Sequence, residues 1–371
     1  MKRRSKRILK IVYLAVLFLA TLLVGYLFTR ENPPGRDFFS ILAKINPFWF
    51  LAAVLAMVVY WMSEAWVLNY ITAFMYRRES YWHSLKMNMI GQYYSALTPF
   101  GHGQPVQVAY MGRDGMPVGI ATFILTLKFI IYELIIVVYC LIFMIARIGY
   151  YYTHYPEVFW FTIAGIGINL VIVMVVIFAV LCNAATKKAV LGITKFLSKI
   201  KIIKNSVKAA ETVGKTLDDF HESSKYLKDH KPNIVIAALI TMVQYIAFFL
   251  IPYFLYVAFG FGLLSGKPSP IEDATPFTEA LDLVVMAAFL YLAVCFFPTP
   301  GAAGANETGF GIFFSRFMGG EWAVAMFLWR LITYYSNILI GFLIIFIDGF
   351  ARRHPRQNIP ESKKNLITKK Q

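Results

Sequence analysis

Two short stretches rich in proline and glycine decide how this sequence folds. Residues 299–308 read TPGAAGANET, and residues 98–107 read TPFGHGQPVQ. Both begin with Thr-Pro, continue with glycine, and interrupt long apolar runs. Proline cannot donate a backbone hydrogen bond, and glycine adopts backbone angles that other residues avoid. Each stretch therefore predicts a break between two helices in an otherwise apolar chain.

The composition predicts an all-α polytopic membrane protein. The 371-residue chain is 58% hydrophobic and only 15% charged, whereas soluble domains contain about 25% charged residues. Several apolar runs reach about 20 residues, which is enough to cross a hydrocarbon core of about 30 Å. A transmembrane β-barrel would instead show short segments of alternating hydrophobicity. We therefore expect about six full helical spans in a cell (cytoplasmic) membrane.

The apolar runs divide into full spans and two shorter segments. The predicted full spans are 8–28, 47–70, 117–147, 158–183, 233–259 and 322–348. Residues 81–97 and 277–297 are also apolar, but they run into the two Pro/Gly stretches. A lysine-rich linker at 184–232 is expected to contain an amphipathic helix that lies along a membrane surface. A basic tail at 351–371 ends the chain.

The positions of lysine and arginine predict the orientation of these segments. The formal net charge is +16, and the cations cluster before the first span, at Arg77 and Arg78, in the linker and in the tail. Cytoplasmic loops are enriched in such residues, so we expect both termini in the cytoplasm. Residues 81–116 must then begin and end inside, and residues 276–320 must begin and end outside. The distribution of lysine and arginine thus predicts two re-entrant helical hairpins of opposite orientation.

The two hairpins also resemble each other, which favours an inverted repeat. Lys128 follows Thr98 by thirty residues, within KFIIY, and Arg330 follows Thr299 by thirty-one, within RLITY. Each cation has a tyrosine four residues after it. We expect repeat 1 at about 47–183 and repeat 2 at about 233–348, both within one membrane domain covering 1–350. Inverted-repeat transporters bind substrate near the bilayer midplane, where the repeats meet.

The predicted substrate site holds charged residues at membrane depth. Lys128 and Arg330 lie deep in apolar segments, where an unpaired charge costs about 3 kcal/mol or more, so both are functional candidates. Helix N-termini after the turns would add free N–H groups that suit a phosphate. We expect the two cations to hold the phosphate of a lipid head group. A structural ion pair with Glu64, Glu133 or Glu307 is the alternative, and Glu64 and Glu133 are themselves also candidates for the head-group site.

The remaining candidates surround the same turns. Polar side chains that could add to the head-group site are Thr98, Gln104, Gln107, Thr299, Asn306, Arg113 and Arg316. The turns are expected to be formed by Pro99, Gly101, Gly103, Pro300, Gly301 and Gly304. A surface role is the alternative for Arg113 and Arg316. Glu307 could neutralise Arg330 or Arg316, bind a cationic head group or titrate, and His102 is expected to be a hydrogen-bonding turn residue.

With these motifs, the sequence resembles the flippase-like membrane domain of lysylphosphatidylglycerol synthases. The resemblance rests on TPFGHGQPVQVAYMGRDGMPVGIATFILTLKFIIYEL, on FFPTPGAAGANETGFGIFF and on FLWRLITYY, and it covers roughly residues 51–350. It implies the lipid-translocating region of that family. We expect a stand-alone member without the synthase domain, because only about twenty residues follow the last predicted span.

The leading hypothesis is a lipid translocase that is not an enzyme. It would move a phospholipid, or a related anionic or aminoacylated lipid, between the leaflets of a bacterial cytoplasmic membrane through a central polar cavity. The sequence contains no HExxH, G-x-S-x-G or Walker A motif. No catalytic residue, metal or cofactor is therefore expected.

The expected partners follow from the same reasoning. Membrane lipids should place a head group in the cavity and anionic head groups at the lysine-rich linker, while homo-oligomerisation stays open. Nucleic acid is not expected, because charge asymmetry across a bilayer accounts for the basic net charge. Two alternatives remain: an integral-membrane lipid transferase that uses Glu307 and Glu133 as acid and base, and a non-transporting lipid-binding scaffold.

Overall fold

The computed structural model describes residues 38–98, 103–199, 206–271, 274–295 and 297–353. Every regular element in these ranges is a helix, which confirms the all-α prediction. The predicted first span at 8–28 and most of the basic tail lie outside the described residues. Three predicted turn residues, Pro99, Gly101 and His102, also lie outside them.

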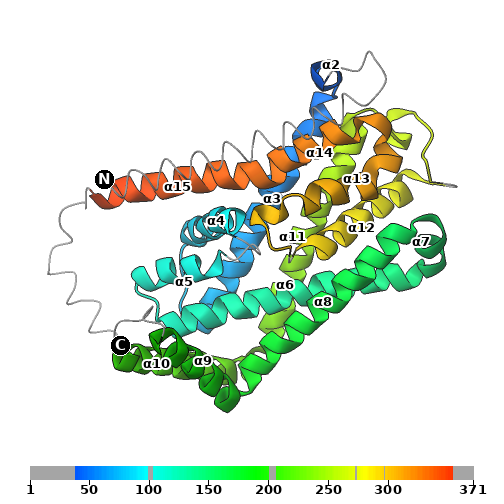
Figure 1. The fold of residues 1–371 in the computed structure, drawn as a ribbon. Helices are drawn as coiled ribbons and strands as arrows, with labels where there is room; N and C mark the ends of the chain where they lie inside the picture. Colours follow the sequence, from blue (N-terminus) through cyan, green and yellow to red (C-terminus); the bar gives the residue numbers. More distant parts are fainter. Residues whose placement is uncertain (1–37, 99–102, 200–205, 272–273, 296, 354–371) are drawn as a thin grey trace.

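A frame of long helices runs through the molecule (Figure 1). Its members are α3 (Pro47–Met75), α6 (Val118–Ala146), α8 (Pro156–Leu181) and α11 (Lys231–Ala258). A last long helix consists of α14 (Trp322–Arg330), the single π-helical turn η6 (Leu331–Tyr335) and α15 (Ser336–Arg353). Helices α3 and α11 lie side by side, and the Asn46 backbone N–H donates to the Ala258 carbonyl at 2.9 Å.

Local sequence signals explain where several of these helices begin. Asn46 caps α3 by accepting a hydrogen bond from the Phe48 N–H, and Pro47 follows at the first helical position. Asparagine is a favoured N-cap residue, and proline suits the first turn because its missing N–H would be unpaired there. Thr275 begins α12 (Pro276–Val294) in the same way, with a capping box to Thr278.

Two helical hairpins are inserted into this frame. Hairpin 1 consists of α4 (Tyr81–Leu97) and α5 (Gln104–Arg113), and hairpin 2 consists of α12, the short turn η4 (Pro300–Ala302) and α13 (Ala305–Met318). The lysine-rich linker forms α9 (Asn183–Lys199) and α10 (Ser206–Tyr226). We call the side of the molecule with α9, α10 and residues 76–80 the linker end. The far end holds α2 (Phe38–Leu42), α7 (Ile148–His154) and residues 259–271.

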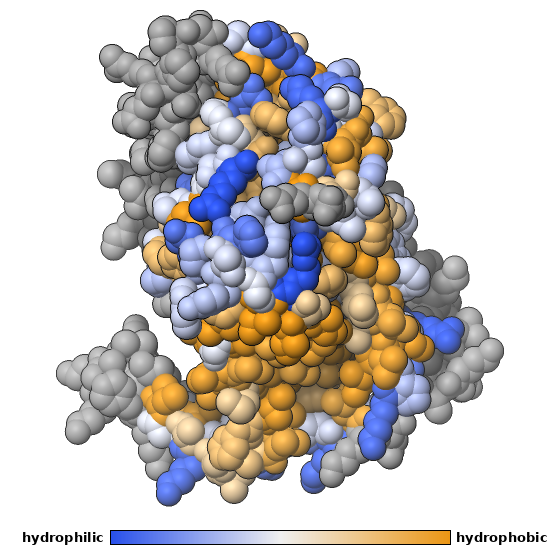
Figure 2. Space-filling view, turned by 90° about the vertical axis from the view of Figure 1, so that its right-hand side faces the viewer, coloured by the Kyte–Doolittle hydropathy of each residue, from blue (hydrophilic) through white to orange (hydrophobic). Residues whose placement is uncertain are grey.

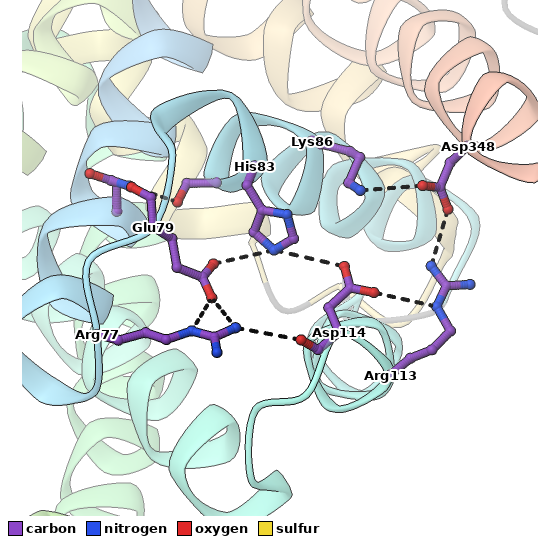
Figure 3. A network of polar contacts seen from close by, with 9 residues as sticks. Arg77, Glu79, His83, Lys86, Arg113, Asp114 and Asp348 are labelled. Carbon is purple, nitrogen blue, oxygen red and sulfur yellow. Dashed lines mark hydrogen bonds and ion pairs between the residues drawn. The ribbon is translucent and has the colours of Figure 1, made fainter. Parts of the chain in front are cut away.

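Each hairpin begins and ends on its own side of the molecule. At the linker end, Arg77 reaches the Asp114 carbonyl, and Asp348 at the end of α15 accepts from Lys86 at 3.2 Å and from Arg113 at 3.1 Å (Figure 3). This network ties both helices of hairpin 1 to α15. Hairpin 2 is held at the far end, where Arg147 pairs with Asp282 and Arg316 donates to the His154 carbonyl.

Six described helical segments are long and apolar enough to cross a membrane: 47–75, 118–146, 156–181, 231–265, 276–294 and 300–349. This finding agrees with a multi-pass membrane protein. The segment 276–294 was expected to be one arm of a re-entrant hairpin, although its length would also permit a full crossing. That either hairpin is re-entrant in a bilayer stays a prediction.

The outer surface has the composition of a lipid-facing wall. Along α8, large apolar side chains are exposed at Trp160, Phe161, Ile163, Ile168, Val171, Met174, Val175, Phe178 and Leu181. Soluble monomers rarely expose a continuous apolar surface of this extent. Figure 2, viewed from the side of α7, shows a hydrophilic area above a broad hydrophobic surface.

The linker helices pack against the frame. Phe220 of α10 is 8% exposed and meets the Phe123 ring of α6 edge-on, with ring centroids 5.3 Å apart. Gly119 makes this approach possible, because a Cβ there would lie 2.5 Å from the Thr216 carbonyl oxygen. The apolar face of α10 therefore packs against protein.

Candidate functional site

A polar cavity of about 300 Å³ lies where the two hairpins approach each other. Gly91, Gln92 and Gln107 of hairpin 1 line it, and so do Gly301 and Asn306 of hairpin 2. The frame helices contribute side chains from α3, α6, α11 and α14. The hairpin 1 side is joined to the last long helix by the Tyr334 hydroxyl, which donates to the Ala96 carbonyl at 3.0 Å.

The first charged cluster surrounds Lys128. Its Nζ lies 2.9 Å from Glu64 Oε1 and donates to Asn88 Oδ1 at 2.9 Å. The other oxygen of Glu64 accepts from Asn88 Nδ2 at 2.8 Å and from Gln92 Nε2 at 2.6 Å. Lys128 and Glu64 are 7% and 5% exposed. The carboxylate therefore keeps two amide donors of its own in addition to the ammonium group.

The second charged cluster surrounds Arg330. Its Nε lies 2.9 Å from Glu307 Oε1, in a geometry too poorly aligned for a hydrogen bond, so we treat the contact as an ion pair. Its Nη1 donates to the Gly301 carbonyl at 3.1 Å. That carbonyl also accepts from Asn306 Nδ2 at 2.9 Å. Glu307 Oε2 accepts from the Gly304 N–H at 2.6 Å, which caps α13.

The repeated cation and tyrosine spacing has a counterpart in the geometry. Lys128 Nζ lies 5.2 Å from the centre of the Tyr132 ring, and the Arg330 guanidinium carbon lies 4.2 Å from that of Tyr334. Residues four apart are neighbours on a helix face, and a cation over an aromatic face is attracted by the ring quadrupole. Each cation thus has a carboxylate and an aromatic ring as neighbours.

Glycine is required at two points of closest approach. Gly301 has φ of 60°, and a Cβ there would lie 2.1 Å from the Tyr334 ring. A Cβ on Gly103 would lie 2.1 Å from the Gly91 carbonyl oxygen. Any larger residue would therefore push the tip of hairpin 2 away from the last long helix, or separate α5 from α4.

Four residues that line this cavity have a buried polar atom without a hydrogen bond among the described residues: Gln107 Nε2, Glu133 Oε2, Trp329 Nε1 and Arg330 Nε, the last of which is ion-paired with Glu307. Buried polar atoms are usually paired, and an unpaired one needs a specific explanation. Glu133 Oε2 and Gln107 Nε2 therefore keep hydrogen-bonding capacity that the described part of the protein does not use.

Comparison with known proteins places the chain in a family. Residues 11–341 match the family described as "Lysylphosphatidylglycerol synthase TM region". The chain belongs to this family. A UPF0104 membrane protein of Archaeoglobus fulgidus is 26% identical over 307 residues, which cover 81% of this chain and 87% of that protein. The resemblance inferred from the two Pro/Gly stretches is therefore confirmed.

In this member of the lysylphosphatidylglycerol synthase TM family, the cavity brings together many of the predicted site residues. Those that line it are Glu64, Gln104, Gln107, Lys128, Glu133, Gly301, Asn306 and Arg330. Glu307 lies behind Arg330 as its ion-pair partner. Of the alternatives weighed for the two cations, the structure pairs Lys128 with Glu64 and Arg330 with Glu307.

Other predicted residues lie outside the cavity. The hydroxyls of Thr98 and Thr299 donate to the backbone carbonyls of Tyr94 and Ala303, both at 2.8 Å. Arg113 belongs to the network at the linker end (Figure 3), and Arg316 lies at the far end over Tyr155. Pro300 begins the turn η4, and Gly304 precedes α13 with φ of 86°.

Sequence reasoning missed Asn88 and Gln92, which hold Glu64 in place. A signal was available, because these two amides lie four residues apart in the apolar segment 81–97 and so share one helix face. The π-helical turn at 331–335 was also missed. Such turns are frequent at functional sites, and this one directly follows Arg330.

Proposed function

We propose that the protein is a lipid translocase that moves a phospholipid, or a related aminoacylated lipid, between the two leaflets of a cytoplasmic membrane. One observation carries the proposal: a single cavity, lined from both hairpins, contains two paired cations and one unpaired carboxylate. The proposal involves no covalent step, cofactor or metal. It follows the charge distribution in placing both termini in the cytoplasm, with the lysine-rich linker near anionic head groups.

The ion pairs are built so that the cations can exchange partners. Glu64 keeps the amides of Asn88 and Gln92 if Lys128 turns to a phosphate. Glu307 likewise keeps the Gly304 N–H if Arg330 does so. A charge-assisted hydrogen bond contributes about 1.5–3 kcal/mol, so these donors stabilise each carboxylate after the exchange. A head-group phosphate can therefore replace either carboxylate as the partner of the cation, and the displaced carboxylate still accepts hydrogen bonds.

The carboxyl group of Glu133 would allow the cavity to bind a cationic group in addition to a phosphate. Glu64 and Glu307 pair with the two cations, so Glu133 is the acidic side chain of the cavity lining that has no ion pair among the described residues, and its Oε2 lacks a hydrogen bond. An ammonium group would satisfy it. The lipid that fits best carries a phosphate and an amine in one head group.

A leaflet-sidedness assay in proteoliposomes tests the proposal. The variant Arg330→Gln/Glu307→Gln removes both charges of the second cluster, and glutamine at position 307 can still cap α13. We expect lipid translocation to fall at least about tenfold, which corresponds to one lost interaction of about 1.4 kcal/mol. Mass spectrometry of the lipids after incubation checks that no new product forms, as a transferase would require.

The matched control is Arg147→Gln/Asp282→Asn, which removes the ion pair that holds hairpin 2 at the far end, outside the cavity lining. We expect translocation by this control to stay within about twofold of wild type, a barrier change of about 0.4 kcal/mol. If the Arg330→Gln/Glu307→Gln variant translocates lipid as fast as the wild type, the proposal that lipid head groups pass through this cavity is refuted.

A further inference from the structure

A second hollow opens beside the polar cavity, between α5, α6 and α8. Its volume is about 480 Å³, and Val108, Thr126 and Val176 are among its walls. It shares three lining residues with the polar cavity, namely Gln104, Leu125 and Phe129. The two spaces therefore adjoin along a common wall. We call this second hollow the lateral cleft.

Most of the residues that line the lateral cleft are apolar. The hydroxyls of Thr122 and Thr126 donate to the backbone carbonyls of Val118 and Thr122, at 2.7 and 2.8 Å. These hydrogen bonds occupy the polar atoms within α6. The contributions of α5 and α8 include Pro105, Ile172 and Val176. Gln104, at the junction with the polar cavity, is the exception.

The cleft lies in the half of the molecule nearer the linker end. Toward the far end, α8 is closed against α12: Asn169 Nδ2 lies 3.3 Å from the Leu292 carbonyl, and a Cβ on Gly165 would lie 2.9 Å from the same oxygen. Ile172 and Val176 follow one and two turns later, where α8 borders the cleft. The side opening thus belongs to one half only.

We propose that the lateral cleft receives an acyl chain of the lipid whose head group occupies the polar cavity, and that this lipid enters from the leaflet at the linker end. The inference rests on the proposed function and extends it with an entry side and a chain site. Acyl chains gain little by leaving the bilayer, because lipid tails are as apolar as leucine side chains. The cleft instead lets the head group enter while its chains stay in apolar surroundings.

The chemistry along the route favours a lipid over a protein helix as the occupant. Along a lipid molecule, a charged head group is followed by polar ester groups and then by hydrocarbon chains. The protein offers the same order: the paired cations of the polar cavity, then the Gln104 amide at the junction, then the mostly apolar lining of the lateral cleft. An apolar helix seated there would bury that amide without a partner, which costs about 1–3 kcal/mol. The apolar helix to be tested against the lipid is the predicted first span, residues 8–28, and the experiment must be able to detect it in the cleft.

Photo-crosslinking in proteoliposomes tests the occupant directly. The probe is a phospholipid with a diazirine in one acyl chain, and labelled positions are mapped by mass spectrometry. We expect labelling at Thr126 and Val176 that saturates and is displaced by excess unlabelled phospholipid. Met174 and Val175, which are 60% and 63% exposed on the outer face of α8, should be labelled without saturation. Equal, non-saturable labelling at all four positions would show ordinary surrounding lipid and overturn the proposal.

A chemical crosslink between residues 8–28 and the cleft walls, with no lipid label at Thr126, would also overturn the proposal. A transport measurement then separates this inference from the proposed function. Val176→Trp fills the cleft, and its neighbour Val175→Trp adds the same bulk to the exposed face. We expect translocation to fall at least about tenfold in the first and to stay within about twofold in the second.

The outcomes distinguish the two proposals. A wild-type protein that translocates lipid, together with an equally active and folded Val176→Trp variant, would refute the cleft alone. A wild-type protein that does not translocate, but shows saturable labelling at Thr126 and Val176, would refute the proposed function while the chain site stands.

Discussion

The ion pair between Lys128 and Glu64 gives a quantitative test of how the cavity is held together. The two charged atoms lie 2.9 Å apart, and the side chains are only 8% and 7% exposed. Removing one partner of such a pair costs about 3–5 kcal/mol, whereas replacing both partners by neutral residues is often neutral or stabilising. Glu64→Gln and Lys128→Met are suitable changes because glutamine keeps the shape of glutamate, and methionine replaces the apolar stem of lysine without its charge.

The neighbouring amides predict which single change costs more. Lys128→Met leaves Glu64 with the donors of Asn88 and Gln92, so we expect a loss near the lower limit, about 3 kcal/mol. Glu64→Gln leaves the ammonium group with uncharged acceptors, Asn88 Oδ1 among them, and we expect a loss of about 4 kcal/mol. The double variant should lose less than about 2 kcal/mol.

Equilibrium unfolding in mixed micelles with increasing sodium dodecyl sulfate measures these free energies as a double-mutant cycle. A double variant that loses the sum of the two single losses would refute the interaction. The folded double variant also separates structure from transport. If Lys128 holds a phosphate, translocation falls despite the recovered stability. Translocation at the wild-type rate would instead leave the pair with a purely structural role.

Three further changes probe other parts of the site. Glu133→Gln should slow translocation of an amine-bearing phospholipid about tenfold relative to phosphatidylglycerol, without lowering the unfolding free energy, because Glu133 Oε2 has no partner to lose. Gly301→Ala should cost more than about 2 kcal/mol of stability, since it adds backbone strain of about 1–2 kcal/mol to a clash with Tyr334; Gly349→Ala, with nothing near its Cβ, should instead be neutral or stabilising in the same unfolding assay. Asp348→Asn should cost at most about 1 kcal/mol of stability, because its partners Lys86 and Arg113 are partly exposed. Thermal melts at increasing salt should show that the difference from wild type shrinks.

The helical framework was largely predictable from hydropathy. The predicted spans at 117–147 and 233–259 differ from α6 and α11 by only one or two residues at each end. The prediction for α3 stopped at residue 70, whereas the helix continues to Met75. Hydropathy follows the apolar window, but a helix continues into the interface for as long as its backbone hydrogen bonds are unbroken.

The environment of the linker could not be read from its pattern. An amphipathic helix has an apolar face, and periodicity does not say whether that face meets lipid or protein. Here Phe220 of α10 packs against Phe123 of α6. The close approach depends on Gly119, more than ninety residues away in the sequence. Such a pairing is decided by tertiary packing and not by the linker itself.

Parts of the candidate site were predictable where the free-energy cost of burying one residue in the membrane was large enough to single it out. A cation at membrane depth is expensive, and this cost identified Lys128 and Arg330 without any structure. The choice of partner was different, because sequence reasoning left Glu64, Glu133 and Glu307 as alternative partners of the two cations. Helix packing placed the first beside Lys128 and the third beside Arg330. Glu133 was left without a partner for its Oε2.

The two halves of the cavity are alike in their cations but differ in where each carboxylate comes from. Lys128 and Glu64 both belong to the long frame helices α6 and α3, and hairpin 1 contributes only the supporting amides. Arg330 belongs to α14, whereas Glu307 is carried by hairpin 2.

This difference has a mechanical consequence. A displacement of hairpin 1 removes the amides of Asn88 and Gln92 but leaves Lys128 neutralised, because its partner stays in the frame. A displacement of hairpin 2 carries Glu307 and the Gly301 carbonyl away together, and both are ligands of Arg330. Only the displacement of hairpin 2 therefore leaves a cation in the cavity without its carboxylate partner. The half of the site that is sensitive to hairpin position is therefore the Arg330 half, and a head-group phosphate would bind there most tightly when hairpin 2 has moved.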